Sequence, residues 1–219
     1  MANPIRRSVR LLLVGTVHLD PRGQHRLLGL LRDWKPEAIA IEVSPYAVQF
    51  RQSQGAGWRA RLERFRLPDQ SLPGGLDAVE AKLRLPFEYT AARAHARAAN
   101  VPLHLLGDSE RSRQLLDLLV AEMMTEENLE RLSVPSEMGT LEERVEAEWR
   151  LAKRRFATGC LMGTAEACRI AAEDAAMAER IRSLGAGDRW VHVCGWEHLR
   201  GLSAELSDLT PEIRLLCAE

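Results

Sequence analysis

The alternation of short apolar runs with amphipathic stretches predicts an α/β fold. Apolar runs of strand length lie at residues 9–14, 38–43, 101–106, 189–194 and 213–217. Residues 24–34 place leucines on one side of a predicted helix that ends before Pro36. Because apolar strands separated by helices are typical of parallel sheets, we expect a central, mostly parallel sheet with helices on both faces.

Two regions depart from this alternation within what we expect to be a single domain spanning residues 1–219. Residues 52–86 are rich in glycine and proline, which predicts a loop-rich excursion with short helices. Residues 110–156 predict a helical insertion, and an alanine-rich helix follows over 161–184. A chain of 219 residues with 46% hydrophobic residues is enough for one sizeable core.

Composition narrows the classes of partner. Thirty basic and 31 acidic residues give a net charge of -1, which argues against a nucleic-acid binder. No apolar run reaches the roughly 18 residues of a membrane span. Four cysteines without a Cys-X-X-Cys pair predict reduced core thiols in a cytoplasmic protein. The helices of 110–156 need a covering surface, so a homodimer is one expectation.

Two matching motifs are the most informative feature of the chain. Gly15-Thr16-Val17-His18 follows the first predicted strand, and Gly195-Trp196-Glu197-His198 follows the fourth. Glycine at a strand exit allows a sharp turn, and the histidine then lies at the edge where parallel sheets bind ligands. One such histidine is more often structural, but two matching exits favour a shared functional site.

Acidic residues are expected at the same edge. Glu42 interrupts the otherwise apolar second run near its C-terminal end. A charge inside such a strand is costly without a partner, so we favour a functional role over that of a partly exposed strand-end acid. Asp108 follows the third run, where it is a catalytic candidate or the N-cap of the next helix.

Helical spacing adds two carboxylates. Asp174 lies in the middle of an apolar stripe and should be buried. Glu88 begins a helix over 87–100, where a carboxylate also suits the helix dipole. We expect both to support the site. His95 lies about 10 Å along the helix from Glu88 and is expected to be a core residue, as are His25, His104 and His192.

Two imidazoles with carboxylates make a typical site for Mn, Fe, Co or Zn. With His18, His198 and Glu42 as ligands, such a divalent ion would activate water for hydrolysis of a peptide or small-molecule substrate, with Glu42 as ligand or general base. Two alternatives stay open: a non-catalytic protein that binds or sequesters a peptide or haem, and a metal-free esterase with a histidine base. A Cys194 nucleophile is disfavoured because strand cysteines are usually core residues.

The sequence resembles the TraB/PrgY/Tiki family over about residues 9–202. The resemblance lies in LLLVGTVHLD, IAIEV, the helix beginning Glu88-Tyr89, VPLHLLGDSERSRQLL, EDAAMAERI and HVCGWEHLRGL. It implies an erythromycin-esterase/ChaN-like α/β fold. The Tiki branch implies a metal-dependent protease that uses Mn or Co. The TraB and PrgY members imply inactivation or sequestration of peptide pheromones.

The same resemblance assigns roles residue by residue. In this resemblance His18 and His198 match the motif histidines and Glu42 matches the strand-two glutamate. Glu88 matches the helix glutamate, Asp108 the acid after strand three, and Asp174 the acid before a Met-Ala pair. The chain departs from the family pattern at Ala172-Glu173, where Glu-Arg is common, and at Ser44-Pro45-Tyr46, where an arginine often follows the glutamate.

Overall fold

The computed structural model describes residues 10–73, 75–134, 139–158, 164–184 and 189–217. Within them the chain forms a five-stranded sheet of order β3-β2-β4-β1-β5, in which every neighbouring pair is parallel. The α/β fold with a parallel sheet is therefore confirmed. The strands are β1 (Arg10–Thr16), β2 (Ala38–Ile41), β3 (Leu103–Leu105), β4 (Arg189–Gly195) and β5 (Glu212–Leu215).

The strand ends differ from the sequence-based expectation in a way that affects the site. Gly15 lies inside β1, which continues through Thr16. The strand is longer because β1 stays paired with β4 as far as Thr16, which lies opposite Gly195. Glu42 directly follows β2, whereas the predicted strand extended through Val43 and contained it. Its backbone N–H still donates to Val193 O of β4 at 2.9 Å, so its position is fixed by the sheet.

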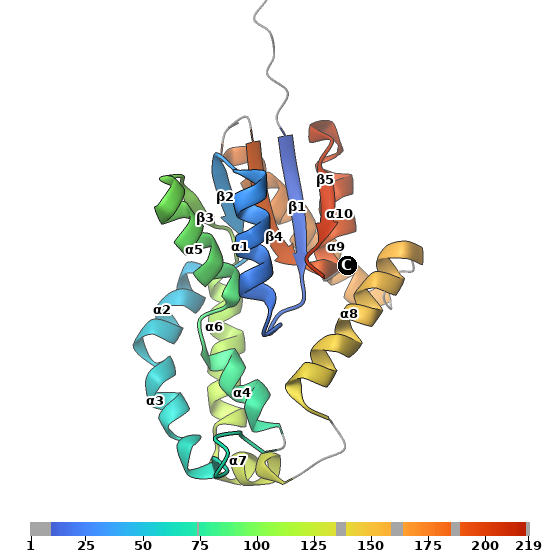
Figure 1. Cartoon of the computed structure of the whole chain (residues 1–219). Helices are drawn as coiled ribbons and strands as arrows, with labels where there is room; N and C mark the ends of the chain where they lie inside the picture. The colour runs from blue at the N-terminus through green and yellow to red at the C-terminus, as the bar shows by residue number, and fades with distance from the viewer. Residues whose placement is uncertain (1–9, 74, 135–138, 159–163, 185–188, 218–219) are drawn as a thin grey trace, which may run out of the picture.

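Helices cover both faces of the sheet (Figure 1). On one face, buried leucines of α1 (Gly23–Trp34), alanines of α5 (Phe87–Ala99) and Val145, Trp149 and Ala152 of α8 (Leu141–Thr158) pack against β1, β2 and β4. On the other face, α9 (Thr164–Ser183) and α10 (Leu199–Glu205) contribute the buried apolar side chains. This is the two-sided burial that the apolar strands require.

The remaining helices lie beyond the carboxyl ends of the strands, below the sheet in Figure 1. They are α2 (Pro45–Ser53), α3 (Gly55–Ala60), α4 (Leu76–Leu83), α6 (Ser109–Leu118), a π-helical turn at Leu119–Met123 and α7 (Glu126–Ser133). A small core of their own joins α4, the π-helical turn and α7. The expected excursion and the first part of the expected insertion, up to Ser133, thus form one helical extension next to the strand ends, whereas the rest of the insertion is α8, which packs against the sheet.

Two composition-based expectations have mixed outcomes. No helix among the described residues combines the length and apolar character of a membrane span. Cys194 is a buried thiol as expected, whereas Cys168 is exposed because it lies on the outer side of α9, and Cys217 is half-buried. Cys160 lies outside the described residues.

Candidate functional site

The two histidine motifs lie side by side because the strands that precede them are neighbours. β1 and β4 pair in a register that sets Gly15 opposite Cys194 and Thr16 opposite Gly195. On the other side of β4, Ile41 is opposite Val193, so Glu42 emerges at the same level. The sheet therefore brings both motifs and the strand-two glutamate to one edge, where ligands of parallel sheets bind.

His198 is held at both ring nitrogens. Its Nδ1 lies 2.7 Å from Asp174 Oδ1 and its Nε2 lies 3.2 Å from Glu42 Oε1. The second oxygen of Glu42 accepts a hydrogen bond from the Gly195 backbone N–H at 2.9 Å. Asp174 of α9, His198 after β4 and Glu42 after β2 thus form a continuous row of side chains across the edge of the sheet.

His18 forms a second pair of the same kind. Its Nδ1 lies 2.8 Å from Glu88 Oε1, and the Thr16 hydroxyl donates to that oxygen at 2.9 Å. We assign a proton to Nδ1, because this oxygen of Glu88 then accepts from both the ring and the Thr16 hydroxyl. Glu88 is almost fully buried, whereas 57% of the His18 side-chain surface is exposed. His18 is therefore the accessible member of the cluster and His198 the buried one.

Local sequence explains where the supporting acids stand. Asp174 is 2% exposed, because the apolar stripe that flanks it on α9 is buried as predicted. Gly201 of α10 lies so close that an added Cβ would overlap the Asp174 carboxylate. Glu88 occupies the first turn of α5, where the helix dipole favours a negative charge.

The charges in this cluster stabilise one another. Burial alone lowers the pKa of His198, but hydrogen bonds to Asp174 and Glu42 outweigh it and raise that pKa to about 10. Burial alone raises the pKa of Glu42, but the hydrogen bond and charge of His198 and the charge of His18 lower it to about 2. For His18, partial desolvation lowers the pKa, and the hydrogen bond and charge of the Glu88 carboxylate raise it by more, with a net increase. Desolvation raises the pKa of Asp174.

Asp108 stands apart from these pairs. Its side chain accepts the Arg111 backbone N–H at 3.0 Å as the N-cap of α6, which is the structural alternative considered above. Its further charged partner is Arg180, at 4.0 Å. No described hydrogen bond or ion pair joins it to either motif histidine. His95 on α5 and His192 on β4 are buried, as expected of core residues. His104 is half-buried, and the expectation for His25 was wrong, because His25 lies on the exposed side of α1.

Several residues at the site were not identified from the sequence. Thr16 lies within the first motif, yet nothing marks its hydroxyl as a partner of Glu88. Glu173 Oε2 lies 4.0 Å from His198 Nε2, and its other oxygen pairs with Arg111 and Arg169. Adjacent helix residues point in different directions, so the position of Glu173 beside Asp174 did not predict its approach to His198.

The imidazole and carboxylate groups of the site are of the types that bind divalent ions, but their positions do not complete a coordination shell. Glu42 Oε1 and His198 Nε2 are 3.2 Å apart, close to the roughly 3 Å between two donors that share an ion at about 2.1 Å. Across the described ranges, no group of three or more His, Cys, Asp or Glu side chains is arranged to hold a metal ion. The ready donors are therefore a pair, with His18 next to them.

Comparisons with known proteins do not add a family. No protein-family model matches the chain, and no similar protein was found among curated ones. The resemblance to the TraB/PrgY/Tiki family stays a prediction from the residues named above.

Proposed function

We propose that this protein is a metal-dependent hydrolase of peptide or amide bonds, with its centre at the carboxyl ends of β1, β2 and β4. The observation that supports this most is the shared geometry of His18 and His198. Each ring is tied through Nδ1 to a carboxylate that is at least 95% buried. Metal-binding histidines almost always have such a partner on the nitrogen that does not bind the ion.

The proposed donors are Nε2 of His198, Nε2 of His18 and Oε1 of Glu42. Asp174 and Glu88 fix the tautomer and orientation of the two rings. The Gly195 N–H holds the other oxygen of Glu42. Glu42 is assigned the role of ligand because its Oε1 lies 3.2 Å from His198 Nε2, close to the separation of two donors that share an ion. A bound ion would polarise the substrate carbonyl and acidify water.

Water is the proposed nucleophile because the nearby side-chain nucleophiles are enclosed. The Thr16 hydroxyl is fully buried and donates to Glu88. Cys194 is 1% exposed, and desolvation raises the pKa of its thiol well above the ordinary value, which keeps it protonated. Neither residue can reach a substrate as placed, which disfavours a covalent intermediate on either side chain.

A second candidate is metal-free hydrolysis with His198 as a general acid–base. The observation that favours it is the Asp174–His198 pair at 2.7 Å, since a buried carboxylate on Nδ1 also orients a catalytic imidazole. The two candidates use the same residues and differ in their response to a chelator.

The test is titration calorimetry of Mn²⁺ and Co²⁺ into the full chain, purified without chelator. We expect stoichiometric binding, weakened about tenfold or more in His18→Ala and in His198→Ala. His25→Ala is the matched control, because His25 is exposed on α1, and it should bind like the parent protein. A parent protein that binds neither ion, or variants that all bind equally, would refute the metal site.

Turnover is then measured on a library of quenched fluorescent peptides, with the ion and with EDTA. Hydrolysis that EDTA abolishes supports the proposal. Hydrolysis that EDTA leaves intact supports the metal-free candidate. Saturable peptide binding without cleavage in the ion-loaded protein would indicate a sequestering protein instead.

A further inference from the structure

Helix α8 contacts both histidine loops through consecutive residues. Trp149 Nε1 donates to Oδ2 of Asp20, the residue two positions after His18, at 3.1 Å. Trp196 Nε1 donates to Glu148 Oε1 at 3.2 Å, two residues before His198. One turn of a single helix therefore spans the two loops, which are 180 residues apart in the chain.

The first loop depends on Asp20 for its shape. Asp20 is 5% exposed and also accepts hydrogen bonds from the Arg22 backbone N–H at 2.9 Å and Arg26 Nη1 at 2.6 Å. Leu19, between His18 and Asp20, has a φ of 68°, in the left-handed region that leucine rarely adopts. Such a conformation persists only when its surroundings hold it, and the bond from Trp149 is one of the contacts that do so.

The helix is itself fixed at both ends. At its start, Asp77 of α4 accepts from the Leu141 backbone N–H at 2.8 Å and from Arg144 at 2.6 Å. Near its end, Arg200 of α10 donates to the Phe156 carbonyl. Between these points, α8 buries Trp149 in the core of the sheet. A helix held this way is a rigid reference for the loops that contact it.

We propose that α8 is a positioning element that sets the relative placement of His18 and His198, with Trp149 and Glu148 as its positioning residues. Their described hydrogen bonds go to Asp20 and Trp196 and not to the donors themselves, so they act through these two residues. The consequence for an ion or substrate rests on the proposed function, whereas the bracing of the loops does not. Donors must be held within a fraction of an ångström to share an ion, so loosening either loop weakens binding.

The test is amide hydrogen exchange by NMR on the full chain. The reporters are Asp20 and Gly23 for the first loop, whose N–H groups bond to Val17 O and Asp20 O, and Gly195 and Leu199 for the second. Trp149→Phe removes the indole N–H and keeps an aromatic ring in the core; Glu148→Ala removes the acceptor on the exposed side of α8. Each should speed exchange about five- to tenfold in its own loop.

Two further variants separate bracing from general destabilisation. Glu148→Gln keeps a carbonyl acceptor for Trp196 and should restore protection in the second loop. Trp190→Phe removes another buried indole N–H, one without a hydrogen-bond partner in the described structure, and should leave both loops unchanged. Exchange that stays within twofold of the parent protein in Trp149→Phe and Glu148→Ala would overturn the proposal.

The same proteins are titrated with Mn²⁺. The double variant Glu148→Ala/Trp149→Phe should bind about tenfold more weakly than the parent protein. If the parent protein binds no ion but the exchange pattern is as expected, the bracing stands and the metal-dependent function fails. If the parent protein binds the ion and the double variant matches it in both exchange and affinity, the function stands and the bracing is refuted.

Discussion

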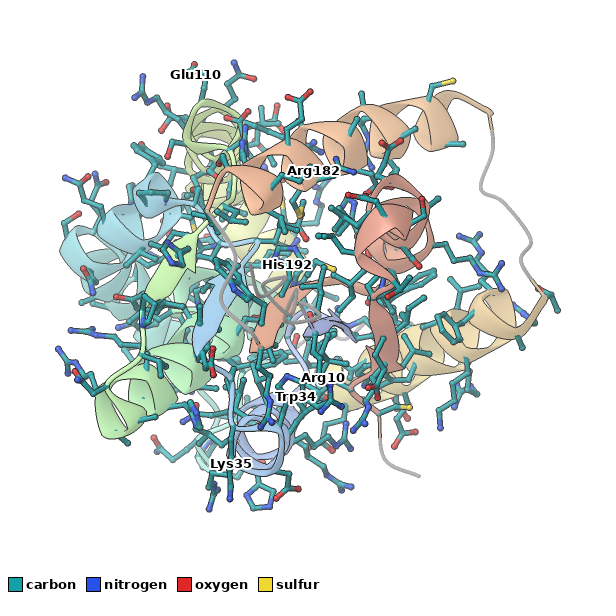
Figure 2. The ribbon with its side chains drawn as sticks, turned by 90° about the horizontal axis from the view of Figure 1, so that it is seen from above. Arg10, Trp34, Lys35, Glu110, Arg182 and His192 are labelled. Carbon is teal, nitrogen blue, oxygen red and sulfur yellow. The ribbon has the colours of Figure 1, made fainter. Side chains whose placement is uncertain are left out.

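Replacing His192 should make the protein more resistant to acid. His192 is fully buried and lies between β4 and α9 (Figure 2). Its Nε2 is 3.0 Å from Met177 Sδ, and its Nδ1 has no partner among the described residues. Burial lowers the pKa of His192 to about 4; of the nearby charges, Glu42 opposes this shift and His198 adds to it.

The sign and size of the effect follow from linkage. The unfolded chain binds a proton at His192 with a pKa of 6.5, and the folded protein with a pKa of about 4. As the pH falls below 6.5 the unfolded state gains that proton first, so the folded state loses stability until the pH passes 4. The loss from this group is about 3 kcal/mol in full. Between pH 7.5 and pH 4.5 it is about 2.5 kcal/mol.

The assay is urea unfolding followed by tryptophan fluorescence at pH 7.5 and pH 4.5. His192→Leu fills the apolar site without a titrating group. We expect the free energy of unfolding to fall by about 2.5 kcal/mol less in the variant than in the parent protein over this interval. That difference corresponds to about 1 M in the urea midpoint. His25→Gln removes an exposed imidazole and should respond to acid as the parent protein does.

The comparison of two pH values isolates His192 because changes elsewhere in the site are common to both proteins. A variant that loses as much stability as the parent protein between the two pH values would refute the reasoning. It would mean that His192 keeps an ordinary pKa, through a hydrogen bond or solvent access that the described structure does not contain.

Three further predictions concern the residues around the site. Asp174→Asn keeps the size of the side chain but removes the charge that orients His198, so ion affinity or turnover should fall 10- to 100-fold with the fold retained by circular dichroism. Asp108→Ala should cost about 1 kcal/mol in urea unfolding, the value of a lost N-cap, and leave ion affinity unchanged; a loss of affinity would return Asp108 to the catalytic set. Gly201→Ala should lower the melting temperature and weaken ion binding because its Cβ would displace the Asp174 carboxylate, whereas Gly29→Ala, in open space on α1, should stabilise the protein by about 0.5–1 kcal/mol.

The centre of the sheet could be predicted because β1, β2 and β4 are buried on both faces. All five predicted runs overlap an observed strand, and their short length between turn signals is what distinguishes them from buried helices. Strand ends were less predictable. Pairing with a neighbour extends β1 through Gly15 and Thr16, and no local pattern in a glycine and a threonine announces that extension.

The two motifs come together for a reason that local sequence does not contain. They need adjacent strands in the same register, and the order β2-β4-β1 provides this by inserting the fourth strand between the first two. The motifs' likeness suggested a shared edge, but only the pairing of Thr16 with Gly195 makes them neighbours. Asp174 followed from periodicity, because helical spacing alone places a side chain on the buried stripe of α9.

The contacts of α8 with the two histidine loops could not be predicted from the sequence, for a physical reason. Asp20 and Trp149 meet across 129 residues, and neither belongs to a motif whose chemistry calls for the other. A tryptophan on an amphipathic helix is adequately explained by burial, so its indole N–H gives no sequence signal of its own. The contacts proposed to position the site therefore use residue types that are also common in ordinary packing. The proposed donors are easier to recognise in the sequence, because carboxylates and imidazoles are costly at a buried strand end. The motifs therefore point to the side chains of the candidate site, whereas the contacts proposed to position those side chains come from a helix that the motifs do not include.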